Sequence, residues 1–185
     1  MIKKIKWQLL ISSVVTLLPV VFGLIYWNQL PATMASHWGA DGVADGTATK
    51  GFVVFGMPLI LLALHWLLVW VSFVIDKNNA QNKKMVMICH SIIPALSIVV
   101  HIFIYSASLE KEWDLTALIP VFVGALLLFI GNYMPKTTRN RTVGIKLRWT
   151  MGNDENWQKT HRLGGKIYFW GGLAVIVSAL LPVKI

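Results

Sequence analysis

The sequence predicts an all-α, polytopic helical membrane protein with five transmembrane helices in a single membrane domain, residues 1–185. Hydrophobic residues make up 56% of the chain and charged residues only 14%, whereas a soluble domain carries about 25% charged residues. The apolar residues also come in long blocks rather than in amphipathic periods. Finally, 14 of the 17 Lys and Arg residues fall before the first block or in alternate connections between the blocks, as the positive-inside rule predicts for a multi-pass protein.

Each block is close to the roughly 20 residues that a helix needs to cross about 30 Å of hydrocarbon. None alternates apolar and polar residues as the strands of a membrane barrel do. The expected spans are residues 7–27, 52–75, 85–106, 115–133 and 167–183.

The first block follows Met-Ile-Lys-Lys-Ile-Lys, which is also how a secretory signal can begin. Its apolar stretch is longer than a signal core, and Tyr26-Trp27-Asn28 is not a small-residue cleavage site. We therefore expect a retained first span.

Basic residues set the expected orientation. Three lie before the first block, three between the second and third, and eight between the fourth and fifth. These connections should face the cytoplasm, which puts the N-terminus inside and the C-terminus outside. The net charge of +9 then reflects the orientation of the chain, since basic residues on the inner face are attracted to anionic lipid. No direct binding of nucleic acid is expected. The lone Cys89 can form no internal disulfide.

The outer loop, residues 28–51, is rich in Gly, Asp and Thr, which favour turns. His37, Asp41 and Asp45 follow one another at four-residue spacing and offer ligand types that bind several metals. The alternative is an ordered surface loop in which Trp38 lies at the membrane interface and the Asp residues close turns. The sequence favours this second interpretation and leaves metal binding unknown.

Polar residues in the third block form one helical stripe, since offsets of 4, 7 and 11 residues fall within about 40° of His90, and Tyr105 follows at the same four-residue spacing. Its members are His90, Pro94, Ser97, His101 and Tyr105. His65, near the middle of the second block, is expected to approach this stripe. Ionisable groups at such depth indicate either a proton or ion path or neutral histidines bonded to helix backbones. The absence of intramembrane Asp, Glu, Lys or Arg beside them favours the second.

The motif loop, residues 134–166, carries the richest chemistry. Apolar and polar residues alternate from Val143 to Trp149, so an extended segment could direct Lys146 and Arg148 to phosphate or solvent. Asn153 and Asp154 predict a helix start. That helix should run to about Leu163 and end at Gly164-Gly165, before the last span.

Residues of this helix share a face by three- and four-residue spacing, and the turn at Met134-Pro135-Lys136 brings other polar residues near it. Together they would bind an anion, a lipid headgroup or a peptide backbone, or else act as an interfacial anchor. No nucleophile–base pair or metal-ligand spacing is complete, so we expect neither catalytic residues nor a cofactor. The candidate binding residues are Asn132, Pro135, Asn140, Arg141, Gly144, Lys146, Trp149, Trp157, Thr160, His161 and Arg162.

Residues 131–166, GNYMPKTTRNRTVGIKLRWTMGNDENWQKTHRLGGK, resemble the signature of the SdpI family, the immunity membrane proteins of the bacterial sporulation-delaying toxin system. The matching positions are Gly131, Asn132, Pro135, Asn140, Gly144, Ile145, Lys146, Trp149, Thr150, Trp157, Thr160, His161, Arg162 and Gly164. The outer loop resembles the uncharacterised domain that often precedes this signature, through Pro31, His37, Trp38, Gly39, Asp41, Gly42 and Pro58.

This resemblance implies a multi-pass protein of the bacterial inner membrane that protects its cell against a secreted, membrane-active peptide toxin. It also implies, as in the family's type member, that a soluble repressor is sequestered at the cytoplasmic face. Our leading hypothesis is a non-enzymatic immunity or signalling protein. The alternatives are a membrane enzyme or headgroup-binding protein using Asn140, Arg141, Trp157 and His161, with His as the natural acid or base, and a small transporter or channel built on His65, His90 and His101.

Overall fold

The computed structural model describes residues 2–39, 43–75, 83–109 and 115–181. Within these residues, five helices are long and apolar enough to cross a membrane. They are Lys6–Ile25, Phe52–Ser72, Met87–Ser108, Leu118–Lys136 and Asp154–Leu180. The prediction of a helical protein with five spans is therefore confirmed. The chain forms two compact units, which are described in turn.

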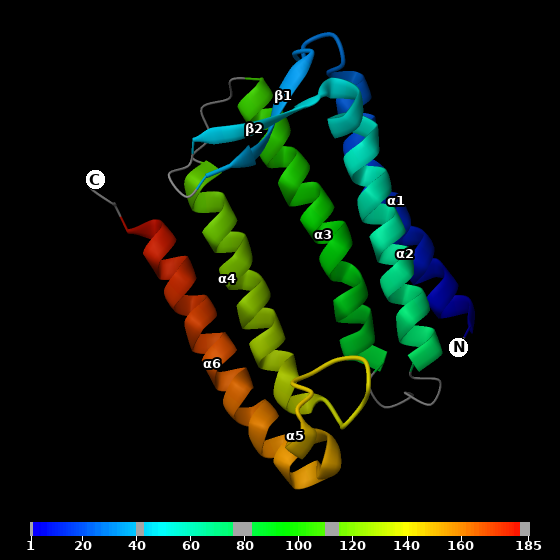
Figure 1. Cartoon of the computed structure of the whole chain (residues 1–185), viewed down its shortest axis with the longest axis vertical. Helices are drawn as coiled ribbons and strands as arrows, with labels where there is room; N and C mark the ends of the chain where they lie inside the picture. The colour runs from blue at the N-terminus through cyan, green and yellow to red at the C-terminus, as the bar shows by residue number, and fades with distance from the viewer. Residues whose placement is uncertain (1, 40–42, 76–82, 110–114, 182–185) are drawn as a thin grey trace. The chain divides into compact units, whose positions relative to one another are not determined.

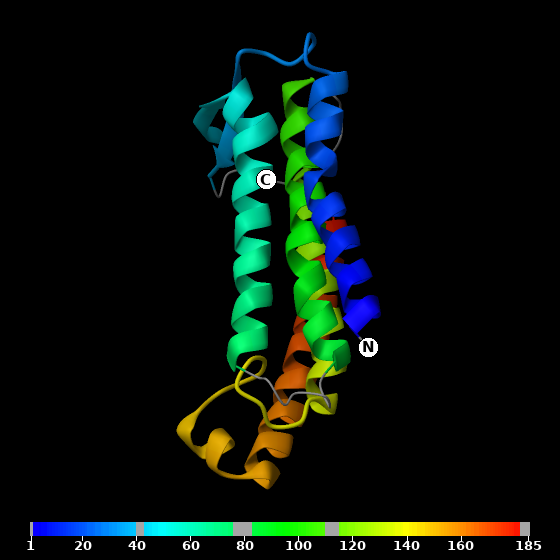
Figure 2. The same cartoon turned by 90° about the vertical axis from the view of Figure 1, so that its right-hand side faces the viewer.

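Unit 1 consists of Met1–Trp70 and Ile88–Trp113. It contains the helix α1 (Ile2–Ile25), the strands β1 (Thr33–Trp38) and β2 (Ala44–Thr49), the short π-helix η1 (Phe52–Gly56), and most of the helices α2 (Met57–Ile75) and α3 (Lys83–Ser108). In Figures 1 and 2, α1 runs alongside α3, and the two strands lie at one end of these helices.

The strands form an antiparallel hairpin within the segment that the sequence predicts as an outer loop. The register pairs Thr33 with Thr49 and Trp38 with Ala44, with an irregularity between Ala35 and Trp38. Met34, between residues that face outward, is only 1% exposed. It belongs to a hydrophobic cluster with Leu30, Val53, Val54, Ile104 and Tyr105. The hairpin is thus part of the packed core of unit 1 rather than a freely exposed loop.

Lys50 ties the end of the hairpin to the end of α1. Its Nζ donates to the carbonyl oxygens of Trp27 at 2.9 Å and Leu30 at 2.8 Å, and it lies 4.8 Å from the centre of a Trp27 ring. Carbonyls beyond a helix C-terminus are left without helical donors and carry partial negative charge. One ammonium group therefore bonds two carbonyls beyond the C-terminus of α1 and links this segment to the end of β2.

Unit 2 consists of Val71–Met87 and Asp114–Ile185. Its elements are α4 (Leu115–Tyr133), the 3₁₀ turn η3 (Met134–Lys136), the short helix α5 (Arg148–Gly152) and α6 (Asp154–Leu180). Figure 1 shows α4 and α6 side by side, with α5 at the end where η3 leaves α4.

Glycine makes the close packing of α4 on α6 possible. A Cβ atom at Gly124 would lie 2.6 Å from the carbonyl oxygen of Gly172, and one at Gly131 would lie 2.5 Å from the backbone nitrogen of Phe169. Small residues allow such approach between membrane helices, where association depends on van der Waals packing. The two backbones are in contact at both positions, with no room for a side chain between them.

The expected helix end at Gly164-Gly165 is wrong, because α6 continues without interruption from Asp154 to Leu180. These glycines are packing positions rather than caps. A Cβ at Gly165 would lie 2.8 Å from the Gly131 carbonyl oxygen and 2.7 Å from Pro135 Cγ. Of the glycines in the described ranges, Gly144 alone has the positive φ that a glycine cap requires.

We predict that Gly131→Ala destabilises unit 2 by about 1–3 kcal/mol, because the added methyl group meets backbone atoms that cannot move aside. Gly171→Ala is the matched control on α6, since nothing lies within 4 Å of a Cβ there. Thermal unfolding in detergent should show a lower melting temperature for Gly131→Ala alone. Equal melting temperatures for the two variants would show that the helices are not packed this closely.

Candidate functional site

Two stacked rings form the centre of the motif loop. Trp157 and His161, one turn apart on α6, are both 0% exposed, and their ring centroids lie 4.0 Å apart at an interplanar angle of 19°. We call this pair the Trp157–His161 stack. The sequence predicts that these residues share a face, and the structure confirms it. That face points into the loop's own interior rather than toward an open site.

Both ring nitrogens of His161 are engaged. Nε2 lies 3.0 Å from the backbone nitrogen of Ile145, whose N–H can only donate, so Nε2 accepts. Nδ1 lies 2.8 Å from the carbonyl oxygen of Trp157 and therefore donates to it. The neutral tautomer with its hydrogen on Nδ1 satisfies both contacts. In this arrangement the imidazole holds the loop against α6 and has no nitrogen left for a substrate.

Gly144 allows the loop to lie directly on the stack. Its φ is +128°, a conformation that residues with a side chain rarely adopt. A Cβ there would touch Nε2 of His161 and lie 2.8 Å from Cη2 of Trp157. Both the backbone angle and the lack of space therefore demand glycine at this position.

The extended segment expected from Val143 to Trp149 does not form a strand. Only its first two residues, Val143 and Gly144, lie in bends, the next three have no regular structure, and α5 begins at Arg148. Local side chains satisfy the backbone in place of a partner strand. Oδ1 of Asn140 accepts from the backbone nitrogens of Thr142 at 2.9 Å and Val143 at 2.7 Å. The alternation of residue types does not separate buried from exposed positions, because Ile145 packs against Gly164 whereas Leu147 and Trp149 are 40% and 59% exposed.

Thr150 and Thr137 complete the internal bonding. The Thr150 hydroxyl accepts from the backbone nitrogen of Leu147 at 2.8 Å and lies 2.8 Å from the Ile145 carbonyl oxygen. Nε1 of Trp157 donates to the Thr137 carbonyl oxygen at 2.8 Å. The Thr137 hydroxyl in turn donates to the Met134 carbonyl oxygen at 2.6 Å. The indole thus connects α6 to η3, at the end of α4.

A second set of contacts holds the corner between α5 and α6. Nε of Arg139 lies 2.7 Å from a carboxylate oxygen of Asp154, and its Nη1 donates to the Met151 carbonyl oxygen at 2.6 Å. Asn153 caps α6, as predicted, by accepting from the backbone nitrogens of Glu155 and Asn156. The sequence did not single out Arg139, because nothing in its spacing distinguishes it from the other basic residues of the loop.

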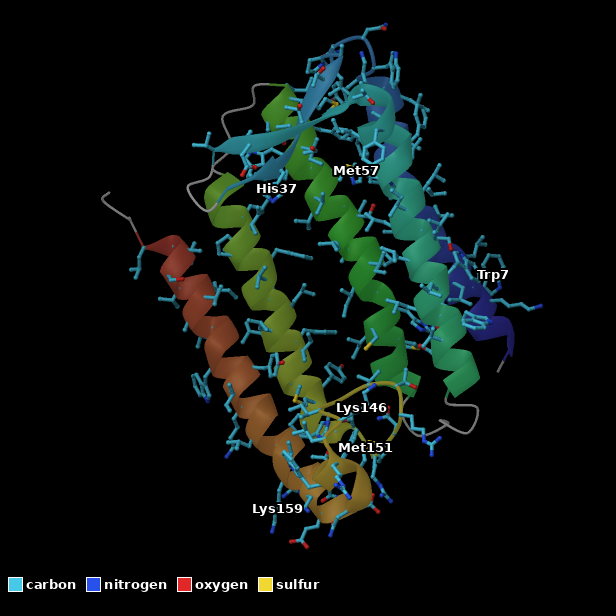
Figure 3. The ribbon with its side chains drawn as sticks, in the orientation of Figure 1. Trp7, His37, Met57, Lys146, Met151 and Lys159 are labelled. Atoms are coloured by element: carbon cyan, nitrogen blue, oxygen red, sulfur yellow. The ribbon has the colours of Figure 1, made fainter. Side chains whose placement is uncertain are left out.

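The candidate binding residues therefore divide into two groups. Asn140, Gly144, Trp157 and His161 hold the loop together, and Thr160 is half-buried. The exposed members are Asn132, Arg141, Lys146, Trp149, Arg162 and Pro135, the last of which also packs on Gly165. Lys146, which Figure 3 labels together with Met151 and Lys159, donates to the carbonyl oxygens of Arg141 and Thr142. Nδ2 of Asn140 and the ammonium of Lys146 thus both bond carbonyls of the loop itself.

The polar residues predicted within the membrane spans all belong to unit 1. His65 is 1% exposed, and its Nε2 lies 2.8 Å from Oγ of Ser12, which itself donates to the Leu9 carbonyl oxygen. The ring centroids of His65 and His90 are 6.2 Å apart, so the expected approach of His65 to the stripe is confirmed. Sequence reasoning missed Ser12 and Thr16, although their four-residue spacing in the first span was a visible signal.

Three stripe residues bond the backbones of other elements. Oγ of Ser97 donates to the Thr16 carbonyl oxygen at 2.8 Å, and the Tyr105 hydroxyl donates to that of Pro19 at 2.9 Å. Nδ1 of His101 lies 2.7 Å from the Ser97 carbonyl oxygen, and Nε2 lies 3.3 Å from that of Val53. This geometry favours the interpretation that the histidines hold helices together over the interpretation of an ion path.

A π-helix explains why the Val53 carbonyl is available. In η1 the bonds run to the fifth residue back, as from the Met57 N–H to the Phe52 carbonyl. The next donor in that pattern would be Pro58, which has no N–H. Nε2 of His101 lies where this missing donor would be.

On the hairpin, His37 and Asp45 form an exposed ion pair. Asp41, the third residue of the predicted metal-ligand trio, lies outside the described residues, as does Gly42. Pro31 is exposed just before β1. Trp38 packs its ring edge-on against Phe103, with centroids 4.2 Å apart, so it attaches the hairpin to α3.

Comparison with known proteins gives two matches along the chain. Residues 14–62 match a domain of unknown function (DUF1648), and residues 136–185 match the SdpI/YfhL protein family. The curated immunity protein SdpI of Bacillus subtilis (strain 168) is 21% identical over 168 residues, which cover 91% of this chain and 79% of that protein. No solved structure matches the chain.

The matched segments coincide with the hairpin and its neighbouring helices and with the motif loop. The first runs from α1 through the hairpin and η1 into α2, and the second contains α5 and α6 with most of the motif loop. The family resemblance carried by the motif loop and the outer loop is confirmed. The chain is thus a multi-pass protein of the bacterial inner membrane related to the SdpI immunity family, with a DUF1648 domain preceding its SdpI/YfhL segment.

Proposed function

We propose that this protein is a membrane immunity protein that protects its cell against a secreted, membrane-active peptide. The observation that carries the proposal is the similarity over 91% of the chain to a protein named for immunity. The packing within each matched segment supports it, because both are folded structures rather than plain connections between spans.

The proposed orientation has the N-terminus in the cytoplasm. Successive spans alternate in direction, so the connection after the first span and the connection after the fourth lie on opposite sides of the membrane. The hairpin would then be outside and the motif loop inside, which agrees with the distribution of Lys and Arg. Lys50, which would lie outside, is engaged at the end of α1, so its position has a structural reason.

The hairpin is the surface that we assign to the peptide toxin. A two-stranded sheet has two edges, to which an extended peptide can add a strand. Val43, beside the turn, is an apolar side chain that is 61% exposed. The contacts of Met34 and Trp38 hold this surface rigidly on unit 1. A rigid hairpin loses little conformational entropy when a peptide binds.

The motif loop would present a second surface, to a soluble regulator in the cytoplasm. Support comes from Trp149, 59% exposed on the short helix α5, beside the exposed Arg148. Tryptophan and arginine are the residue types most enriched at binding hot spots. A binding role also agrees better than catalysis with His161, whose two nitrogens are engaged within the loop.

The direct test is expression in a host sensitive to a cognate peptide, with survival as the measurement. The wild-type protein should protect. Val43→Asp should reduce protection about tenfold, because placing a charge in an apolar contact costs at least the 1.4 kcal/mol that corresponds to tenfold in binding. Val43→Leu, which keeps the apolar surface, should protect as the wild type does. Failure of the correctly inserted wild type to protect against any such peptide would refute the proposal.

The orientation is tested by labelling with a membrane-impermeant maleimide in a Cys89→Ser background. Val43→Cys should be labelled in intact cells, and Lys146→Cys only after permeabilisation, since the two positions would lie on opposite sides. Labelling of Lys146→Cys in intact cells would reverse the assignment of the two surfaces.

The role of His161 is tested by His161→Ala. This change should cost roughly 2–4 kcal/mol of stability, because it leaves the Ile145 N–H without an acceptor and a cavity beside Trp157. Membrane abundance and melting temperature should fall, and any regulator held at the membrane should be released. Gln158→Ala, at an exposed neighbouring position, should change neither.

An enzyme that used His161 as acid or base would behave differently. His161→Ala would then keep its abundance and melting temperature while it lost activity. That outcome would contradict the structural role and return catalysis to consideration.

A further inference from the structure

Three cations follow one face of α6 at spacings of three and four residues: Lys159, Arg162 and Lys166. All three are exposed. Trp170, one turn beyond Lys166 on the same face, is 64% exposed. Because α6 is one continuous helix, this face runs from the motif loop directly into the membrane span.

The acidic side chains that the structure describes in unit 2 are already paired. A carboxylate oxygen of Glu155 lies 2.6 Å from Nζ of Lys159, and Asp154 is paired with Arg139. No ion pair or hydrogen bond joins the side chain of Arg162 or Lys166 to any residue in the described ranges. Within the described residues, two neighbouring cations of the stripe are therefore without an acidic partner.

The depth of these cations follows from the helix. Lys166 and Arg162 precede Leu180, the last residue of α6, by distances of about 21 and 27 Å at 1.5 Å per residue. The hydrocarbon core is about 30 Å thick. A span that ends near Leu180 on one side therefore places the backbone of Arg162 near the edge of the hydrocarbon on the other side and that of Lys166 about 9 Å inside it. From there the long side chains can extend toward the phosphates.

The surroundings of the two cations agree with this depth. Leu163 and Ile167, which lie next to them in sequence, are 61% and 63% exposed. Side chains of this kind are suited to lipid rather than to water. A charged group in such surroundings needs a partner of opposite charge, or must extend its side chain to the interface.

We propose that Arg162 and Lys166 bind the phosphate of an anionic phospholipid, with Trp170 beside its glycerol and upper acyl region. The guanidinium group can bond two phosphate oxygens at once, and the ammonium one turn away adds a second charge. Tryptophan prefers this level of the bilayer because its ring is apolar and its N–H is polar. The proposal concerns a lipid site and does not depend on toxin protection.

The test uses the full-length protein in nanodiscs of phosphatidylcholine, into which phosphatidylglycerol is titrated, with bound lipid counted by native mass spectrometry after release. The wild type should retain phosphatidylglycerol in preference to phosphatidylcholine. Arg162→Gln combined with Lys166→Gln should bind it about 10- to 30-fold more weakly, as expected for the loss of two basic residues at a membrane surface.

Two control variants distinguish a specific lipid site from non-specific attraction between the basic helix face and anionic lipid. Lys159→Gln removes a cation of the same stripe that already has a carboxylate partner, and should leave retention unchanged. Arg162→Lys combined with Lys166→Arg keeps both charges and should retain most of the lipid. Inorganic phosphate at equal concentration should not displace the bound lipid, because it lacks the apolar part that Trp170 and Ile167 contact.

A second measurement needs no variant. Phosphatidylglycerol should raise the melting temperature of the wild type relative to pure phosphatidylcholine, since a ligand that binds the folded state stabilises it. Equal retention of phosphatidylglycerol by the wild type and the double Gln variant would overturn the proposal and assign these cations to an acidic protein partner. An unchanged melting temperature for the wild type would count against it in the same way.

Discussion

The motif loop depends on the Trp157–His161 stack and on the hydrogen bonds that its two rings make. A connection between two spans must satisfy its own backbone wherever it is buried against the helix ends, because an unpaired buried N–H or carbonyl costs about as much as a lost hydrogen bond. The imidazole supplies the acceptor for the Ile145 N–H, and the indole supplies the donor for the Thr137 carbonyl. Gly144 lets the chain come close enough for both.

The same constraint accounts for the polar groups of unit 1. Ser97 and Tyr105 donate to carbonyl oxygens of α1, and His101 lies beside the carbonyl that Pro58 leaves without a donor. Lys50 does the same for the end of α1. Within a bilayer, water is not available to replace such bonds. Three polar side chains of the third span thus bond backbone carbonyls of other elements, and one of these carbonyls has lost its helical donor to Pro58.

This distribution bears on recognition. The residues that give the motif loop its distinctive composition are largely buried and bonded to the loop itself, so they define the shape of the surface rather than contact a partner. The exposed residues are left to make contacts. Among them are Trp149 and Arg148 on α5 and the cations on one face of α6, together with Val43 on the hairpin. The proposed contacts with a lipid and with a peptide would therefore use exposed residues and leave the packed interior unchanged.

The sequence by itself determined the five spans, because block hydrophobicity is a property of composition over about 20 residues. It also determined the helix start at Asn153 and the family to which the chain is related. Only the tertiary structure decided that Gly164-Gly165 lies inside a helix, since a glycine that caps a helix and one that admits a neighbouring backbone look alike in sequence. Likewise, the direction in which His161 points depends on a contact with Ile145, 16 residues away. Local spacing could place that histidine on a face of α6, but which group its Nε2 contacts depends on the long-range path of the loop.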